Sequence, residues 1–212
     1  MTQPVISTTS PTALWLAEAL RDSIIMGTLP PDETIKGEEV AETYRVEASF
    51  VCEAFKLLAI KGWVDMDSDR GVVISPLTAK EAVTLFESRA ALEIKAVRES
   101  FPKLTQDQIT AAEAALLALK ESFEEDRQKA HVAYHLALYA AADPFLLERV
   151  EQKIREAERY LCFERTVLNT SDADCAEHLA LLHAARARDV ERATRIIEAH
   201  LTQFGRTIAQ KL

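Results

Sequence analysis

The chain contains five histidines, and four of them could meet on facing helices. His131 and His135 are four residues apart in a helical stretch, so both rings leave the same face of one helix. His178 and His200 occur in two later predicted helices, which a bundle can bring opposite the first. Four such imidazoles could hold a metal ion, although a single helical histidine is more often solvated or hydrogen-bonded. His183, five residues after His178, falls on another face and is expected to be structural or exposed.

Arg89 is the other residue whose surroundings suggest ligand binding. It lies in an apolar stretch that includes Leu85, Phe86 and Leu92. A guanidinium in such surroundings could form a bidentate pair with the carboxylate of a small molecule. It could equally form an ion pair with Glu93, four residues later on the same helix. The sequence leaves both interpretations open.

Composition indicates a two-domain protein of the cytoplasm. The 212 residues are 48% hydrophobic with few glycines and prolines, which allows a sizeable core. Apolar runs are too short to span a bilayer, and the first residues lack the layout of a signal peptide. Three cysteines at unrelated spacings argue against a disulfide framework and for a reducing compartment. We therefore expect a cytoplasmic protein without a membrane partner.

The N-terminal third has the pattern of three helices followed by a β-hairpin. Two strands with a polar, glycine-containing turn between them predict the hairpin. This order is typical of a winged helix-turn-helix. The expected elements are helices over 11–26, 37–44 and 48–60 and strands within 62–66 and 72–76.

Beyond Thr78 the strand signal disappears, and alanine, leucine and charged residues dominate. Successive helices with short connections argue for an antiparallel bundle, and Ser171 is a predicted N-cap. The predicted helices lie near 79–100, 105–125, 127–141, 144–165, 171–187 and 189–211. The fold class is therefore mainly α, and four segments are expected: a flexible arm (1–10), a winged helix-turn-helix domain (11–75), a linker (76–78) and a helical metal- and effector-binding domain (79–212).

Several local motifs occur in the order found in one family of regulators. They are Leu20–Pro31 (LRDSIIMGTLPP), Glu53–Val64 (EAFKLLAIKGWV), Arg70–Leu77 (RGVVISPL) and Leu85–Glu93 (LFESRAALE). Together they resemble the GntR family of transcriptional regulators in its FadR/FCD branch. The resemblance implies a winged-helix DNA-binding domain followed by an all-helical FCD domain that binds a small effector.

The same resemblance implies a metal site. Members of the branch place ligands in Asp-x-x-x-His, in a histidine after Glu and in Ala-His-Leu; this sequence has His131-Val-Ala-Tyr-His135, Glu177-His178 and Ala199-His200-Leu201. His131 replaces the aspartate, so the expected set is His131, His135, His178 and His200. Imidazole ligands favour zinc or nickel. With no carboxylate among them, the ion's charge would stay uncompensated and attract a carboxylate effector. Arg89 matches the family's pocket arginine.

The predicted recognition helix departs from the family. Its usual Ser-Arg-Thr-Pro-Val-Arg-Glu-Ala-Leu is replaced by Glu47–Phe55 (EASFVCEAF), in which Ala48 and Cys52 stand where the arginines would be. Up to Thr78 the chain has six Lys/Arg against twelve Asp/Glu, a net charge of −6, whereas a DNA-binding domain usually has a basic surface. The residues that could still contact DNA are Arg45, Ser49, Lys56 and Arg70.

Three functions follow from these patterns. The first is a homodimeric DNA-binding regulator that senses a small carboxylate at a metal site. The second is a metal-dependent ligand-binding protein whose winged helix no longer binds DNA. The third is a zinc enzyme, because three histidines and an open position also suit catalytic zinc; against it, no acid or base with motif-level support accompanies the histidines.

Overall fold

The computed structural model describes residues 9–67, 69–122, 124–164 and 173–212. Internal contacts divide the chain into two compact units, Met1–Pro76 and Leu77–Leu212, called here the winged unit and the helical unit. Each unit has its own core of buried apolar side chains. No helix among the described residues is long and apolar enough to cross a membrane.

The winged unit begins with three helices, α1 (Pro11–Ile25), α2 (Gly37–Tyr44) and α3 (Ala48–Ile60). The Ser10 side chain accepts a hydrogen bond from the Thr12 amide, and Pro11 occupies the first turn, so α1 starts where the sequence predicts. α1 packs against α3, and α2 also packs against α3. Their facing sides contribute to the core, which includes Leu16, Leu20, Ile24, Val40, Val51, Phe55 and Leu58.

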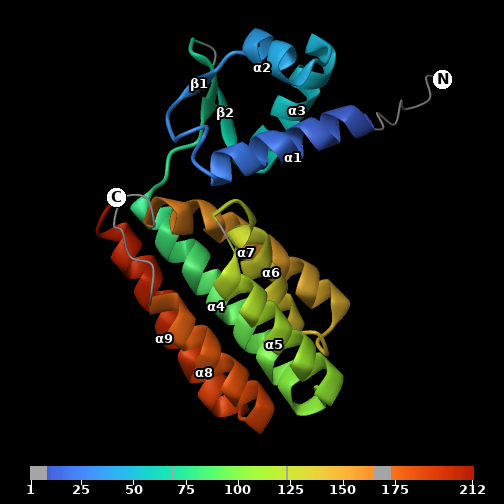
Figure 1. Cartoon of the computed structure of the whole chain (residues 1–212). Helices are drawn as coiled ribbons and strands as arrows, with labels where there is room; N and C mark the ends of the chain where they lie inside the picture. Colours follow the sequence, from blue (N-terminus) through green and yellow to red (C-terminus); the bar gives the residue numbers. More distant parts are fainter. Residues whose placement is uncertain (1–8, 68, 123, 165–172) are drawn as a thin grey trace, which may run out of the picture. The chain divides into compact units, whose positions relative to one another are not determined.

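A small antiparallel sheet completes the winged unit, in the order β1–β3–β2 among the described residues (Figure 1). β2 (Val64–Asp67) and β3 (Gly71–Ile74) form the predicted hairpin, and Gly71 adopts φ 86°, which favours glycine. β1 (Thr34–Ile35) pairs with β3 and was not expected from the sequence. Two residues are too few to show an alternating pattern.

The helical unit is a bundle of the predicted kind, and four of its described helices begin at clear N-caps. Thr78, Asp143 and Asp189 each accept a backbone hydrogen bond at the start of a helix, and Thr105 forms a capping box with Gln108. The predicted N-cap Ser171 lies outside the described residues. The elements are α4 (Ala79–Ser100), η1 (Phe101–Lys103), α5 (Gln106–Glu121), α6 (Glu124–Leu138), α7 (Pro144–Phe163), α8 (Ala173–Ala187) and α9 (Val190–Ala209).

Close packing around α4 sets the position of the functional side chains. α4 lies along α9, as Figure 1 shows in green and red, and also packs against α7. At Gly205 of α9 an added Cβ would lie 2.8 Å from Cβ of Phe86, so the two helices approach too closely for a larger residue. α6 packs against α7, and α8 packs against α9. The interior faces of α4, α6, α7 and α8 can therefore contribute to one buried site.

Candidate functional site

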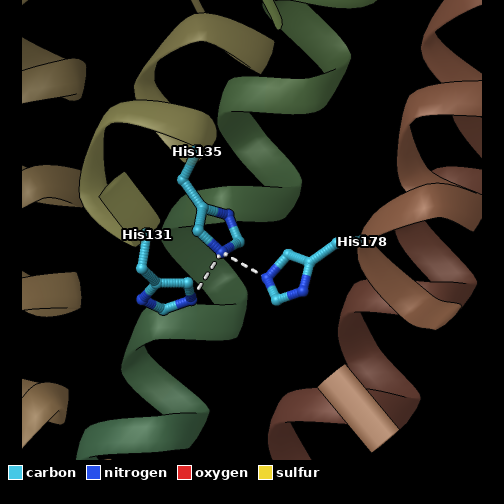
Figure 2. Close-up of side chains that lie close together, drawn as sticks. All are labelled: His131, His135 and His178. Carbon is cyan, nitrogen blue, oxygen red and sulfur yellow. Dashed lines mark hydrogen bonds between the residues drawn. The ribbon is translucent and has the colours of Figure 1, made fainter. Parts of the chain in front are cut away.

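Three of the four predicted ligand histidines converge inside the helical unit. His131 and His135 project from α6 and His178 from α8, and all three are buried (Figure 2). Nε2 of His135 lies 3.1 Å from Nε2 of His131 and 3.3 Å from Nε2 of His178. The i, i+4 spacing places the first two rings on one face, and packing brings the third ring to them.

Hydrogen bonding alone does not explain this convergence. Nε2 of His135 has three polar neighbours, because Nη2 of Arg89 also lies 3.3 Å away. A ring nitrogen offers either one proton or one lone pair, so it cannot satisfy all three. In a tetrahedral zinc site with Zn–N bonds of about 2.0–2.1 Å, ligand nitrogens lie about 3.3–3.4 Å apart. The observed spacing of the three histidines therefore fits metal ligands.

The opposite ring nitrogens of two histidines contact buried carboxylates. Nδ1 of His131 donates to Oε1 of Glu158 at 2.5 Å, and Nδ1 of His135 lies 3.2 Å from Oε2 of Glu93. Both carboxylates are about 1% exposed. A carboxylate at Nδ1 holds the proton there and leaves the lone pair on Nε2, which is the arrangement of metal-binding histidines in proteins.

Arg89 is buried and forms the ion pair with Glu93 that the sequence offered as one alternative. Nε of Arg89 donates to Oε1 of Glu93 at 2.5 Å, while its Nη2 points toward the histidines. The Tyr139 hydroxyl donates to Oε2 of Glu93 at 2.6 Å. The guanidinium thus bridges a carboxylate and the histidine cluster.

The buried groups hold one another in defined protonation states. Burial would raise the pKa of Glu93, but the charge of Arg89 and the contacts of His135 and Tyr139 outweigh it and place that pKa well below its usual range. Burial lowers the pKa of His135 to about 4, against the opposing effect of Glu93. Burial and Glu93 raise the pKa of Tyr139 well above its usual value. At neutral pH the group therefore comprises an ionised Glu93, a neutral His135 and a protonated Tyr139.

His200 does not join the three converging rings. Its ring centroid lies 6.4 Å from that of His178, and its Nδ1 contacts Oε2 of Glu177. This contact resembles those that carboxylates make with Nδ1 of His131 and His135. It also makes Nε2 the nitrogen of His200 that could act as a ligand.

The expected charge of the site needs a correction. From the ligands alone, we expected no carboxylate to compensate a divalent ion, but Glu93 and Glu158 lie directly behind two of the histidines. Arg89 balances Glu93, so Glu158 would be the carboxylate that offsets one unit of charge if these histidines hold a divalent ion. The family pattern gives no sign of these carboxylates because it contains only the residues that could touch the metal directly.

Glu158 and Tyr139 are the site residues that the sequence analysis did not single out. Glu158 lies four residues after Ile154 on α7, on a face that also buries Ala157 and Leu161. A charged residue on an otherwise apolar helix face is a usable signal of a buried partner. Tyr139 lies four residues after His135, which places it on the same side of the chain.

The remaining predicted contacts lie on the surface of the winged unit. Ser49 and Lys56 of α3 are exposed, as are Ala48 and Cys52. Arg45 is exposed and adopts the left-handed conformation, φ 52°, in the turn that joins α2 to α3. These residues therefore lie on or directly before the exposed side of one helix.

Arg70 lies in the connection between β2 and β3, at the tip of the hairpin. Oδ1 of Asp67 accepts hydrogen bonds from the Asp69 and Arg70 amides, both at 2.8 Å. The Arg70 side chain is 61% exposed, and its Nε is 3.8 Å from Asp67 Oδ2. The turn therefore presents Arg70 to solvent.

Both units match known protein families. Residues 84–203 match the FCD domain, and residues 12–74 match the bacterial regulatory proteins of the gntR family. The chain belongs to the GntR family, in its FCD branch. The winged unit is thus the family's DNA-binding domain and the helical unit its effector-binding domain, as the sequence motifs predicted.

Curated relatives of this GntR-family chain are regulators of transcription. The HTH-type transcriptional regulator BphR of Paraburkholderia xenovorans is 27% identical over 199 residues, which are 87% of this chain and 80% of the relative. The HTH-type transcriptional repressor GlaR of Escherichia coli is 26% identical over 196 residues, 86% of this chain and 89% of the relative. The family is one of regulators and not of enzymes, so the zinc-enzyme hypothesis is set aside.

Solved structures of the family share the fold. A GntR regulator from Rhodococcus sp. RHA1 aligns with a TM-score of 0.81 over 96% of this chain and 100% of its own, at 20% identity. A GntR-family regulator from Pseudomonas syringae pv. tomato aligns with a TM-score of 0.58 over 94% of this chain and 85% of its own, at 27% identity. The winged-helix and bundle architecture is therefore that of the family.

Proposed function

We propose that this GntR-family regulator senses a small carboxylate at a divalent transition metal held in its helical unit. His131, His135 and His178 would bind the ion, and His200 is the candidate for a fourth ligand. The observation that carries this proposal is the convergence of three buried Nε2 atoms, two of them on rings whose Nδ1 contacts a buried carboxylate. The pattern supports ligands whose lone pairs are already directed to one point.

The donor set favours zinc or nickel. Imidazole nitrogens suit these ions better than magnesium, calcium or manganese, which prefer oxygen. When bound, the ion would supply a positive centre for a carboxylate oxygen. Glu158 offsets part of the charge, and the remaining unit still favours an anionic effector.

Arg89 would provide the second contact to the effector. Its Nε is engaged by Glu93, but Nη2 points toward the histidine cluster. A carboxylate that binds the metal through one oxygen could accept a charge-assisted hydrogen bond from this guanidinium through the other. Glu93 would then hold the arginine in place for the effector.

Effector binding would be coupled to DNA binding in a homodimer. A two-fold dimer presents two winged units to a palindromic operator, and a ligand that changes the relative stability of two arrangements changes operator affinity. The exposed Arg45, Ser49, Lys56 and Arg70 are the side chains that we assign to DNA.

Metal content of purified variants tests the site. We expect about one equivalent of zinc or nickel per chain by inductively coupled plasma mass spectrometry, and substantially less in His131→Ala and His178→Ala. His183→Ala is the matched control, because His183 lies on the same helix as His178 but is exposed. Metal content that is the same in all three variants and in the parent protein would contradict the proposal.

His200→Ala decides the fourth ligand. If His200 is a ligand, His200→Ala lowers the affinity for zinc while the stoichiometry at saturating zinc stays at one. Glu177→Gln keeps the imidazole of His200 but replaces the carboxylate at its Nδ1, and it should give a smaller loss of affinity. An unchanged affinity in His200→Ala removes His200 from the ligand set.

Calorimetry with a panel of small mono-, di- and tricarboxylates tests the effector. We expect binding to the metal-loaded protein, loss of binding after chelation, and a weaker affinity in Arg89→Lys, which retains the charge but has one nitrogen and cannot contact Glu93 and the effector as the guanidinium does. A carboxylate that binds equally well to chelated protein contradicts the role of the metal.

A ligand-binding protein without DNA affinity is the second candidate, and the composition of α3 favours it. Ala48 and Cys52 are exposed where the family pattern has arginines, in a unit with a net charge of −6 up to Thr78 (six Lys/Arg, twelve Asp/Glu). A salt titration with random duplex and with the DNA upstream of the protein's own gene separates the two candidates. Binding at low salt supports the regulator, and its absence supports the alternative.

A further inference from the structure

In the first turns of α3 the exposed side is made of small, uncharged side chains, and a lysine follows them. Ala48, Cys52 and Lys56 follow one another at four-residue intervals, and Ser49 lies next to them; all four are exposed. The opposite side packs into the core through Val51, Ala54, Phe55 and Leu58. We call the exposed set Ala48, Ser49, Cys52 and Lys56 the contact face.

The position of the contact face in a winged helix predicts that it binds the major groove of DNA. In helix-turn-helix domains the second helix of the motif enters the major groove, and its N-terminal residues contact the base edges. Here that helix is α3, which follows α2 after a short turn (Figure 1). Ala48, Ser49 and Cys52 lie in its first turns, and Lys56 lies one turn further on.

The chemistry of Ala48, Ser49 and Cys52 excludes the most frequent contact to guanine. Arginine and lysine bind O6 and N7 of guanine, whereas the first turns of the contact face offer a methyl group, a hydroxyl and a thiol. A small apolar side chain in the major groove is complementary to the 5-methyl group of thymine. The thiol of Cys52 behaves as a small hydrophobic group with a weak donor.

We propose that α3 recognises its operator through thymine methyl groups, which contact Ala48 and Cys52. Ser49 adds one adaptable hydrogen bond, and Lys56 binds the phosphate backbone. This inference rests on the DNA binding that is part of the proposed function, and it assigns the class of base that the helix selects. The operator half-site is accordingly rich in thymine and adenine under α3, without a required guanine.

Because the winged unit has few exposed cations near α3 and the hairpin, its affinity for DNA should depend only weakly on salt. Arg45, Lys56 and Arg70 are the exposed cations that we assign to DNA, and a further exposed cation, Lys61, follows α3 at its far end. With three phosphate contacts in each winged unit, a dimer on its operator gives a slope of log affinity against log salt of about −5. Affinity therefore depends more on base contacts, and less on salt, than it does in a strongly basic winged helix.

Site selection followed by methyl removal tests the proposal. Full-length protein selects sites from a randomised duplex library at about 50 mM salt. The thymines of the selected half-site are then replaced one at a time by deoxyuridine, which removes only the methyl group. Each replacement opposite Ala48 or Cys52 should weaken binding about fourfold, as expected for one buried methyl. A selected site that depends on guanine, or affinities unchanged by deoxyuridine, would overturn the proposal.

Variants assign the methyl contacts to residues. Cys52→Ser replaces the thiol by a more polar group and should abolish the deoxyuridine effect at one thymine. Ala48→Arg should shift the selected base toward guanine. Ile60→Ser is the matched control, because Ile60 is 83% exposed at the far end of α3 and should retain every effect. A Cys52→Ser protein that responds to deoxyuridine like the parent protein contradicts the assignment.

The experiment also separates this inference from the proposed function. Protein that binds metal but no duplex at low salt overturns both the thymine contacts and DNA binding, and leaves the metal site intact. Protein that binds duplex with a guanine-dependent site overturns only the thymine contacts.

Discussion

A buried ion pair of the helical unit and an exposed ion pair of the winged unit use charged side chains in opposite ways. In the helical unit, Arg89 and Glu93 are about 2% and 1% exposed and form part of a connected buried network. In the winged unit, the Lys36–Glu39 pair has a similar spacing along its helix, but its side chains are 71% and 67% exposed. Both pairs form short contacts, of 2.5 and 2.8 Å. Their distances therefore say little about their energetic importance.

Burial determines where substitutions of charged residues are tolerated. A buried charge must keep its partners, because the uncompensated group cannot recover its hydration. An exposed contact surface can lose charge without unfolding, since water replaces each lost contact. This explains how α3 can have Ala48 and Cys52 at exposed positions while the fold is retained. Specificity can thus change in the winged unit more readily than in the histidine site.

The largest effect is expected from Glu93→Leu. This substitution leaves Arg89 buried without its carboxylate and should lower the free energy of unfolding by about 3–5 kcal/mol. Urea unfolding followed by far-ultraviolet circular dichroism should show the shift. Both tryptophans, Trp15 and Trp63, lie in the winged unit, so the fluorescence transition should move less.

A double variant provides the control for this prediction. Arg89→Met combined with Glu93→Leu replaces the ion pair by apolar groups and should recover most of the lost stability. If Glu93→Leu costs no more than about 1 kcal/mol, which is typical of an exposed pair, the contrast between the two units fails.

An intermediate effect is expected from Glu158→Gln. The amide preserves the size of the side chain but removes the negative charge behind His131, and loss of such a partner typically weakens metal binding 10–100-fold. Competition with a chromophoric chelator measures the affinity. Glu156→Gln on the same helix is the control, because Glu156 pairs with the partly exposed Lys153. Equal zinc affinities in the two variants would show that Glu158 has no such role.

The smallest effect is expected from Lys36→Met. It removes the exposed pair with Glu39 at the start of α2, and the unfolding midpoint from tryptophan fluorescence should not change measurably. A shift as large as that of Glu93→Leu in circular dichroism would mean that exposure does not distinguish the two pairs.

Most of the fold could be predicted from the sequence because its signals are local. Helical periodicity and the short connections between segments mark helices whose observed bounds differ from the predicted ones by a few residues. β1 escaped prediction because Thr34–Ile35 is a strand only through its pairing with β3. Pairing partners distant in the sequence leave no local pattern.

At the site, helical spacing and residue identity alone place His131 and His135 on one helix face and Arg89 among apolar residues. They also show that the first turns of α3 contain no arginine. Only the packing of the helices brings His178 to the first two histidines, whereas His200 contacts Glu177. The same packing places the Glu158 carboxylate at Nδ1 of His131. The physical reason is that helical spacing fixes directions within one helix, whereas contacts between helices depend on how the side chains of all of them pack together.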